Sequence, residues 1–174
     1  MDLLLKAPIY RDYAALLSRH DLSPERPAPT RDRGESMRRA IDLLWGGVGS
    51  LGISWIGFYV LEGDSMVLVC REPKPACSPI GLHGMCGRGV REAHPLIIAD
   101  VRTLGENYVA CDPRDQSELV IPLLDDAGRC DAVLDADSYE VGAFDEHDAF
   151  GMSKVLVSLG LASPHLLTRM PLRL

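Results

Sequence analysis

Five cysteines are the side chains in this sequence best suited to covalent chemistry. They are Cys70, Cys77, Cys86, Cys111 and Cys130. An odd number fits poorly with a fully paired disulfide framework, and a small buried apolar residue is the plain alternative for each of them. Cys111 is followed by Asp112-Pro113, a turn-forming pair that would hold its thiol at the rim of a pocket. Because access and thiolate character control cysteine chemistry, this loop position predicts a reactive thiol at Cys111.

The other cysteines divide by their place along the chain. Cys70 ends a predicted strand and Cys130 lies within another, so we interpret both as structural. Cys77 and Cys86 lie in the segment 71–95, which has no strand pattern, and Cys111 lies in a second such segment, 100–117. Segments of that length without regular structure are usually functional or disordered in a compact domain.

A zinc site is an alternative use of the same group of residues. Cys77, His83, Cys86 and Cys111 could supply ligands. Zinc motifs usually show a tight C-x₂₋₄-C spacing, and the interval from Cys77 to Cys86 is wider than that. We therefore predict neither a metal nor another cofactor.

Three acidic residues form a second candidate group. Asp135 and Asp137 are at i and i+2 on a predicted strand, so their carboxylates point to the same face. Glu118 opens the strand before it. A solvated strand face would suit an isolated Asp-x-Asp, but here the acids interrupt an otherwise apolar strand end, so the three could converge in one pocket. Grouped carboxylates raise one another's pKa and can leave one protonated near neutral pH, as a general acid requires.

Two aromatic residues and a glycine cluster complete the candidates. Trp55 and Tyr59 are four apart on one strand and hence on one face, either as core residues or as a flat wall of a pocket. The backbone amides around Gly84, Gly87 and Gly89 could receive a carboxylate, although ordinary turns explain the glycines equally well.

The elements that must position these residues follow from apolar periodicity. Helical spacing covers 9–20, 35–45 and the stretch after Asp145, a plausible N-cap, to 161. Gly46, Gly47 and Gly49 are expected to end the second helix. Strand patterns cover 53–61, 66–70, 96–99, 118–124 and 129–136. The short connections 62–64 and 125–128 favour antiparallel pairing, because parallel neighbours need a longer crossover. We expect an α+β domain, with helices from both chain ends packed on one face of a five- to six-stranded antiparallel sheet.

Composition limits the class of protein. The 174 residues, 47% of them hydrophobic, can form one sizeable core. We expect an N-terminal helix and Pro-rich linker at 1–34, a catalytic domain at 35–162 and a loosely held tail at 163–174. A net charge of -7 argues against nucleic-acid binding. Without a membrane-spanning run or a signal-peptide pattern, we predict no membrane association and a cytoplasmic location, where structural disulfides are rare.

Six motifs, in order and in approximate register, resemble the free methionine-(R)-sulfoxide reductases, which are GAF-domain proteins. They are WIGFY at 55–59, KPAC at 74–77, GMCG at 84–87, ACD at 110–112, SELVIPL at 117–123 and VLDADS at 133–138. The resemblance spans roughly residues 35 to 161. The segment between Cys77 and Cys86 is one residue shorter than is usual, with His83 where an arginine is common.

The resemblance implies a GAF-like fold and a thiol-dependent reduction of free L-methionine (R)-sulfoxide. Cys111 would be the nucleophile that becomes a sulfenic acid, and Cys77 the thiol that then forms an intramolecular disulfide, with Cys86 as the second candidate for that step. A thioredoxin-type reductant would restore the thiols.

The resemblance also divides the remaining residues. Glu118 and Asp137 would act on the sulfoxide oxygen or in proton transfer, and Asp135 would bind the ammonium group. Trp55 and Tyr59 would flank the methyl-sulfoxide group. A non-catalytic GAF module that senses a small ligand or redox state is the alternative function. The oligomeric state stays open, with a homodimer as one alternative.

Overall fold

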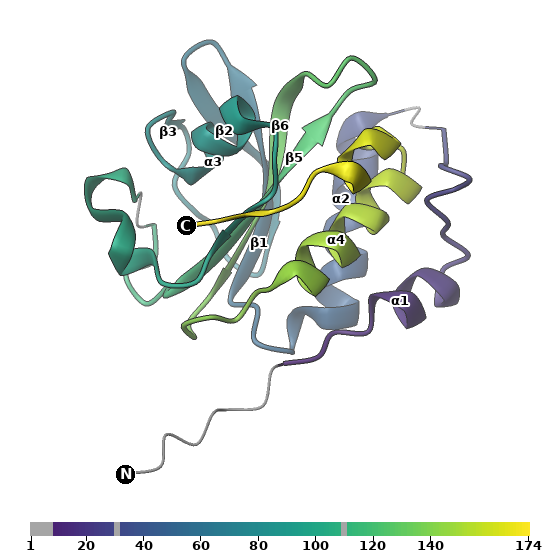
Figure 1. Cartoon of the computed structure of the whole chain (residues 1–174), viewed down its shortest axis with the longest axis horizontal. Helices are drawn as coiled ribbons and strands as arrows, with labels where there is room; N and C mark the ends of the chain where they lie inside the picture. Colours follow the sequence, from purple (N-terminus) through teal and green to yellow (C-terminus); the bar gives the residue numbers. More distant parts are fainter. Residues whose placement is uncertain (1–8, 30–31, 109–110) are drawn as a thin grey trace.

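Short apolar runs form a sheet through the middle of the molecule (Figure 1). The computed structural model describes residues 9–29, 32–108 and 111–174. Its strands are β1 (Trp55–Glu62), β2 (Ser65–Glu72), β3 (Ile80–Gly81), β4 (Leu96–Ile98), β5 (Ser117–Leu124), β6 (Cys130–Ser138) and β7 (Leu172–Arg173). They lie in the order β3-β2-β1-β6-β5-β4-β7, and each neighbouring pair is antiparallel except β4 and β7. The predicted α+β class is confirmed, although the described residues form seven strands instead of five or six.

The two strands that the sequence did not predict lie at the two edges of the sheet. β3 and β7 have two residues each, too few to leave an alternating pattern. β7 pairs in parallel with β4, and Arg173 forms two hydrogen bonds with Glu146 at 2.6 and 2.5 Å. The expectation of a loosely held tail at 163–174 is therefore wrong. The tail consists of a 3₁₀ turn at Pro164–Thr168 followed by this edge strand.

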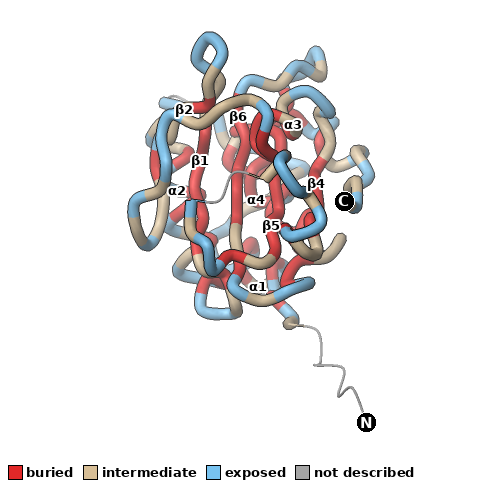
Figure 2. Tube along the Cα trace, turned by 90° about the vertical axis from the view of Figure 1, so that its left-hand side faces the viewer, coloured by how far each residue is buried: buried red, intermediate tan, exposed pale blue. Residues whose placement is uncertain are grey.

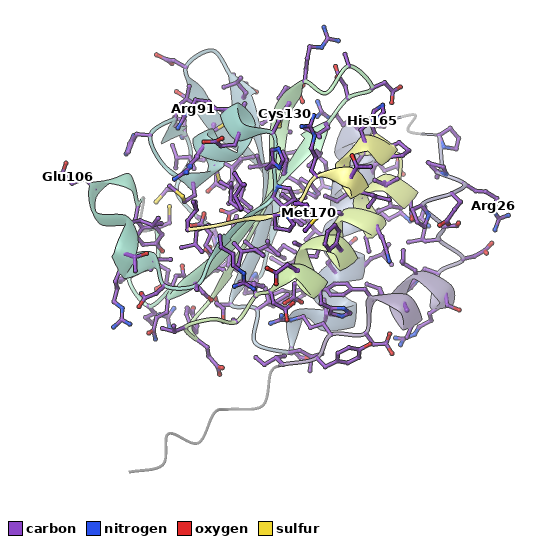
Figure 3. All side chains as sticks on the ribbon, in the orientation of Figure 1. Arg26, Arg91, Glu106, Cys130, His165 and Met170 are labelled. Atoms are coloured by element: carbon purple, nitrogen blue, oxygen red, sulfur yellow. The ribbon has the colours of Figure 1, made fainter. Side chains whose placement is uncertain are left out.

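Three helices cover one face of the sheet (Figure 1), as predicted. They are α1 (Tyr13–Arg19), α2 (Arg33–Leu44) and α4 (Glu146–Ser158). Their apolar side chains fill the space above the strands (Figure 3). Asp145 is the N-cap of α4, as expected, and forms a capping box with Asp148. Helices from both ends of the chain thus bury the same face.

The second helix does not end at its glycines, contrary to the prediction. It continues into one π-helical turn at Trp45–Gly49. A Cβ atom at Gly47 would lie 2.5 Å from Leu16 Cδ1, and one at Gly49 would lie 2.8 Å from Trp45 Cε3. These glycines therefore allow close packing instead of terminating the helix.

The central strands alternate between two packed faces. Ile56 and Phe58 of β1 point into the core under the three helices, whereas Trp55 and Tyr59 point into a smaller cluster on the opposite face. Figure 2 shows buried residues running along β1, β5 and β6. This opposite face is covered by α3 (Met85–Glu92) and the loops around it.

Helix α3 was missed because two of its eight residues are glycines, which disfavour helix interiors. A Cβ atom at Gly87 would lie 2.1 Å from the Leu82 carbonyl oxygen, and one at Gly89 would lie 2.7 Å from Val120 Cγ1. Gly87 is thus required by the close approach of the Leu82 backbone, and Gly89 by packing against β5 and β6. The segment 71–95 is therefore not the long loop that the sequence predicted.

Some sequence expectations fall outside what the structure describes. Residues 1–8 and 30–31 of the predicted N-terminal segment, and residue 110 of the ACD motif, lie outside the described residues. Within the described part of the chain, no helix has the length and apolar character to span a bilayer.

Candidate active site

Side chains from three neighbouring strands meet on the sheet face that α3 covers. Asp137 of β6 lies opposite Trp55 of β1 on one side and opposite Glu118 of β5 on the other. Asp135, two residues earlier on β6, points to the same face. The strand register thus places the three acids and the aromatic wall together, as their sequence spacing predicted.

A cavity of about 220 Å³ opens over this face. The predicted site residues that line it are Trp55, Tyr59, Cys86, Cys111, Glu118, Asp135 and Asp137. Cys77 is outside this lining but beside it, because its side chain and backbone both interact with the Cys111 thiol. A concave site with a few convergent polar groups is typical of small-molecule binding.

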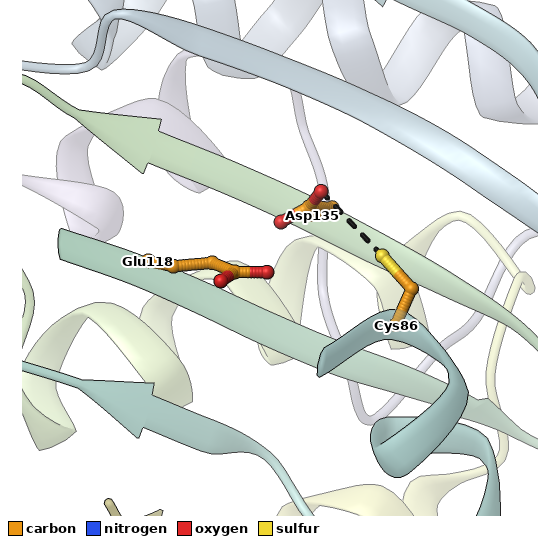
Figure 4. Close-up of side chains that lie close together, drawn as sticks. All are labelled: Cys86, Glu118 and Asp135. Carbon is orange, nitrogen blue, oxygen red and sulfur yellow. Dashed lines mark hydrogen bonds between the residues drawn. The ribbon is translucent and has the colours of Figure 1, made fainter. Parts of the chain in front are cut away.

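Glu118 and Asp135 are buried carboxyl groups with free hydrogen-bonding capacity. Their exposed fractions are 5% and 7%. Glu118 Oε2 and Asp135 Oδ1 have no hydrogen-bond partner among the described residues. Figure 4 shows the two carboxyl groups on neighbouring strands, with Cys86 reaching toward Asp135 from α3. Buried polar atoms without partners are rare in folded proteins, so these oxygens indicate a ligand that completes them.

Burial and mutual repulsion shift the acid–base behaviour of this group. Burial raises the pKa of Asp135 to about 7, although hydrogen bonds with Cys86 and Glu118 oppose the rise. Burial and the neighbouring Asp135 charge hold the pKa values of Glu118 and Asp137 well above their usual range. The cavity therefore offers a protonated carboxyl group near neutral pH beside one that ionises readily.

Cys86 is buried beside the carboxyl groups of Asp135 and Glu118, unlike the exposed Cys77 and Cys111. Its Sγ lies 3.5 Å from Asp135 Oδ2, and the residue is 3% exposed. Burial and the nearby Asp135 and Glu118 charges raise the pKa of its thiol well above the ordinary value. Ligand atoms of Cys86, Glu118 and Asp135 lie within 4.8 Å of one another. Of the residues considered for the alternative zinc site, only Cys86 belongs to this group.

Cys111 and Cys77 are exposed thiols that contact each other across two loops. Partial desolvation, the Cys77 side chain and the Asp135 charge raise the pKa of Cys111 to about 12. At neutral pH Cys111 is thus largely a thiol. A cation bound at Asp135 would oppose one cause of that rise.

The aromatic wall also holds the loop that carries Cys77. The rings of Trp55 and Tyr59 have centroids 6.1 Å apart. Trp55 Nε1 donates to the Lys74 carbonyl at 2.9 Å, and the Tyr59 hydroxyl donates to the Cys77 carbonyl at 2.7 Å. Gly57 lies between them on β1, and a Cβ atom there would be 2.3 Å from Trp55 Cη2. The glycine of the WIGFY motif therefore leaves room for the tryptophan ring.

The sequence of this chain is similar to those of several proteins of known name. No protein-family model matches the chain. The free methionine-R-sulfoxide reductase of Saccharomyces cerevisiae is 30% identical over 126 residues, which cover 69% of this chain and 69% of the yeast protein. The chain belongs to the free methionine-R-sulfoxide reductase family.

Further comparisons support this family membership. The free methionine-R-sulfoxide reductase of Escherichia coli is 37% identical over 109 residues, covering 62% of this chain and 64%, slightly under two thirds, of that protein. The structure of the Neisseria meningitidis reductase in complex with its substrate has a TM-score of 0.68 and 27% identity, and the match covers 85% of this chain and 84% of that one. Solved GAF domains share the fold, so the predicted GAF fold is confirmed.

Several polar residues that line the cavity were not predicted as site residues, and Asp112 is one of them. Tyr108 and Asp115 line the cavity, and so does Lys74. Asp115 Oδ1 accepts a hydrogen bond from Ser54 Oγ at 3.0 Å, and burial raises its pKa. Burial and the Asp137 and Glu118 charges raise the pKa of Tyr108 well above its usual range. Lys74 lies in a quoted motif, but only the fold shows that its side chain reaches the second loop.

The glycine cluster of the reductase fold serves two purposes. Gly84 is the N-cap of α3 and lines the cavity. Gly87 and Gly89 do not line it, and the packing described above explains them. Of the three glycines, only Gly84 lies where its neighbouring amides could meet a ligand.

Proposed function

We propose that the protein reduces free L-methionine (R)-sulfoxide to methionine. The observation that supports this most strongly is the pairing, in one cavity, of a two-thiol rim with a wall of buried carboxyl groups whose oxygens lack partners. A free amino acid sulfoxide has a complementary group for each: a sulfur for the thiol, an oxygen for an acid and an ammonium for a carboxylate.

Binding would use the acids in two ionisation states. Asp135, with its pKa of about 7, ionises readily and pairs with the substrate ammonium. Burial and neighbouring charges hold the pKa values of Glu118 and Asp137 well above their usual range, and these two groups donate a proton to the sulfoxide oxygen. Trp55 and Tyr59 contact the methyl group, and the amides at the start of α3, next to Gly84, receive the carboxylate.

The chemistry would proceed in two steps. Cys111 loses its thiol proton and its sulfur attacks the substrate sulfur, while the oxygen is protonated. The oxygen passes to Cys111 as a sulfenic acid and methionine leaves, so the substrate is reduced by two electrons and Cys111 is oxidised. The Cys77 thiolate then attacks Cys111 Sγ, the S–O bond breaks and water leaves.

Substrate binding would also activate the nucleophile. The Asp135 charge is one cause of the high pKa of Cys111, and a bound ammonium would neutralise it. Cys111 would thus be protected from other electrophiles until the substrate arrives. A thioredoxin-type dithiol would then reduce the exposed Cys77–Cys111 disulfide, which requires a reducing compartment such as the cytoplasm.

The test is incubation of the reduced protein with racemic free methionine sulfoxide and a dithiol, with each epimer followed by chiral separation. We expect loss of the R epimer alone. The same sulfoxide within a peptide should persist, because its ammonium and carboxylate are then amides and Asp135 is left unpaired.

Two serine variants test which cysteine attacks the substrate and which one forms the disulfide. Cys111→Ser should release no methionine, because a hydroxyl is a far poorer nucleophile than a thiolate. Without reductant, Cys77→Ser should release about one methionine per site and then stall as a sulfenic acid that dimedone labels. If Cys86→Ser stalls instead, Cys86 takes the resolving role. Steady turnover by Cys111→Ser would contradict the enzyme function and favour a non-catalytic GAF module.

A further inference from the structure

We propose that Lys74, Asp112, Arg114 and Tyr139 form a clamp that positions Cys77 for its attack on the Cys111 sulfenic acid. These are positioning residues, because they act through the two loops and not on the reacting atoms. The proposal rests on the two-step function above and adds residues to its second step.

The clamp joins three segments that are distant in the sequence. Lys74 Nζ forms an ion pair with Asp112 Oδ2 and a hydrogen bond with the Tyr139 hydroxyl at 2.9 Å. The Tyr139 hydroxyl donates to the same Asp112 oxygen at 3.0 Å. Lys74 is three residues before Cys77, and Asp112 directly follows Cys111. The ion pair therefore ties the two cysteine loops together next to their thiols.

Arg114 holds the Asp112 side of the clamp. Its Nε and Nη2 donate to the two carboxylate oxygens at 3.0 and 2.8 Å, and its backbone N–H donates to Asp112 Oδ1 at 3.0 Å. The guanidinium also lies over the Tyr139 ring, 4.6 Å from its centroid. A carboxylate fixed at both oxygens presents a single orientation to Lys74.

The other side of the Cys77 loop is fixed to the sheet. The hydrogen bonds from Trp55 to the Lys74 carbonyl and from Tyr59 to the Cys77 carbonyl connect it to β1. Ser78 Oγ adds a third connection, because it accepts a hydrogen bond from the Leu68 backbone N–H at 3.0 Å. The Cys77 loop is thus held to the sheet on one side and to the Cys111 loop on the other.

Holding the two loops together raises the rate and the equilibrium of disulfide formation. In that step the Cys77–Cys111 S–S bond forms, the Cys111 S–O bond breaks, and hydroxide takes a proton to leave as water. Both sulfurs come from one chain, so the reaction depends on their effective concentration, which loop motion lowers. Nothing in the clamp is oxidised or reduced.

Substrate binding is the other role open to a lysine at this cavity. Lys74 is the one cation among the described residues that line it. Its ammonium is already paired with Asp112 and bonded to Tyr139, so a substrate carboxylate would have to displace an ion pair. The two roles differ in kinetics: loss of a carboxylate partner raises KM, whereas loss of the clamp slows disulfide formation.

The test compares Lys74→Met with Lys74→Arg, which keeps the charge, and with Arg33→Met as a matched control. Arg33 forms an exposed ion pair with Asp131 away from the cavity. Each protein is equilibrated with glutathione redox buffers, and the Cys77–Cys111 disulfide is quantified by peptide mass spectrometry. We expect Lys74→Met to lower the effective concentration of the pair by about 10-fold, a potential less negative by about 30 mV. Lys74→Arg should recover most of this, and Arg33→Met should match the wild type.

A kinetic arm follows one turnover without reductant. Lys74→Met should release methionine at near the wild-type rate but should accumulate more dimedone-labelled Cys111 than the wild type. An unchanged glutathione equilibrium in Lys74→Met, an equal shift in Arg33→Met, or a higher KM as the sole defect overturns the clamp. The glutathione arm needs no methionine sulfoxide, so failure of the reductase function and failure of the clamp are read separately.

Discussion

The two faces of the sheet bury charge in opposite ways. Under the helices, Arg11 and Asp148 are 0% and 2% exposed and joined by a 2.9 Å ion pair. The Tyr13 hydroxyl donates to the other Asp148 oxygen at 2.8 Å. The Arg11 guanidinium also donates to the carbonyls of Leu51 and Ala143. On the opposite face, Glu118 and Asp135 are nearly as buried but have oxygens without partners.

This difference separates a structural charge from a functional one. Each group of the Arg11 network is matched within the chain, so it can stabilise the fold without help. In the cavity, burial and neighbouring carboxylates raise the pKa values of Glu118, Asp135 and Asp137. None of these three acids forms an ion pair among the described residues, because Lys74 is paired with Asp112 instead, and such a group is typical of a binding site. Changes on the helix face should therefore alter stability, and changes on the cavity face should alter activity.

The largest expected effect is on the helix face. Arg11→Met leaves Asp148 buried without its cation, so the free energy of unfolding should fall by about 3 to 5 kcal/mol. Urea unfolding measures this loss, and activity per folded molecule should not change. The exposed pair Arg33–Asp131 is the control, since Arg33→Met should cost less than about 1 kcal/mol. If the two variants lost the same free energy of unfolding, the buried Arg11–Asp148 pair would matter no more to stability than the exposed Arg33–Asp131 pair.

On the cavity face the expected effect is kinetic. Glu118→Gln removes a proton donor but keeps the side-chain shape, so kcat should fall by about 10²-fold, the scale of a lost general acid. Stability should stay the same or rise, because the parent must protonate Glu118 on folding whereas the amide is neutral in both states. Asp131→Asn, an exposed acid on β6, is the matched control. A parent-like kcat in Glu118→Gln would show that the unpartnered oxygen has no catalytic part.

Periodicity was a good guide to the sheet and a poor one to its edges. The five longer strands were predicted to within about two residues at each end, because runs of apolar residues extend along most of their length. β3, β7 and α3 were missed because their lengths and glycines are dictated by what they pack against. Short elements of this kind are held by tertiary contacts and leave little local signal.

For the site, sequence spacing predicted which side chains share a face but not which loops meet. Asp135 and Asp137 share a face because strand residues alternate. The contact between Cys77 and Cys111 depends on two loops 34 positions apart, and only the resemblance suggested it. The clamp left no signal either, because Lys74, Asp112 and Tyr139 come from three segments whose approach requires the folded sheet.

The smallest expected effect is a pH dependence of stability, which tests the contrast between the two faces at Asp135. The folded pKa of Asp135, about 7, lies above the roughly 3.9 of an unfolded aspartate. A raised folded pKa gives stability that is complete below the unfolded pKa and is lost as pH rises through the folded one. The empty parent protein should therefore lose stability between about pH 4 and pH 8 at this site.

Asp135→Asn cannot ionise, so it should match the parent near pH 4 and exceed it at pH 8. A shift of roughly three pKa units corresponds to about 4 kcal/mol for an isolated group. Because Asp135 titrates together with neighbouring acids, the expected difference is about 2 kcal/mol. The two proteins differ in one titratable side chain, so the difference between the two curves reports Asp135 together with the acids that titrate with it. Free methionine should reduce that difference at pH 8, because its ammonium pairs with the ionised Asp135 of the parent and not with the amide. Urea unfolding at each pH, with and without methionine, measures both effects. If the free energies of unfolding of the two proteins changed with pH in parallel, Asp135 would have to be partnered within the fold, as Asp148 is. The contrast between the two faces of the sheet would then be wrong.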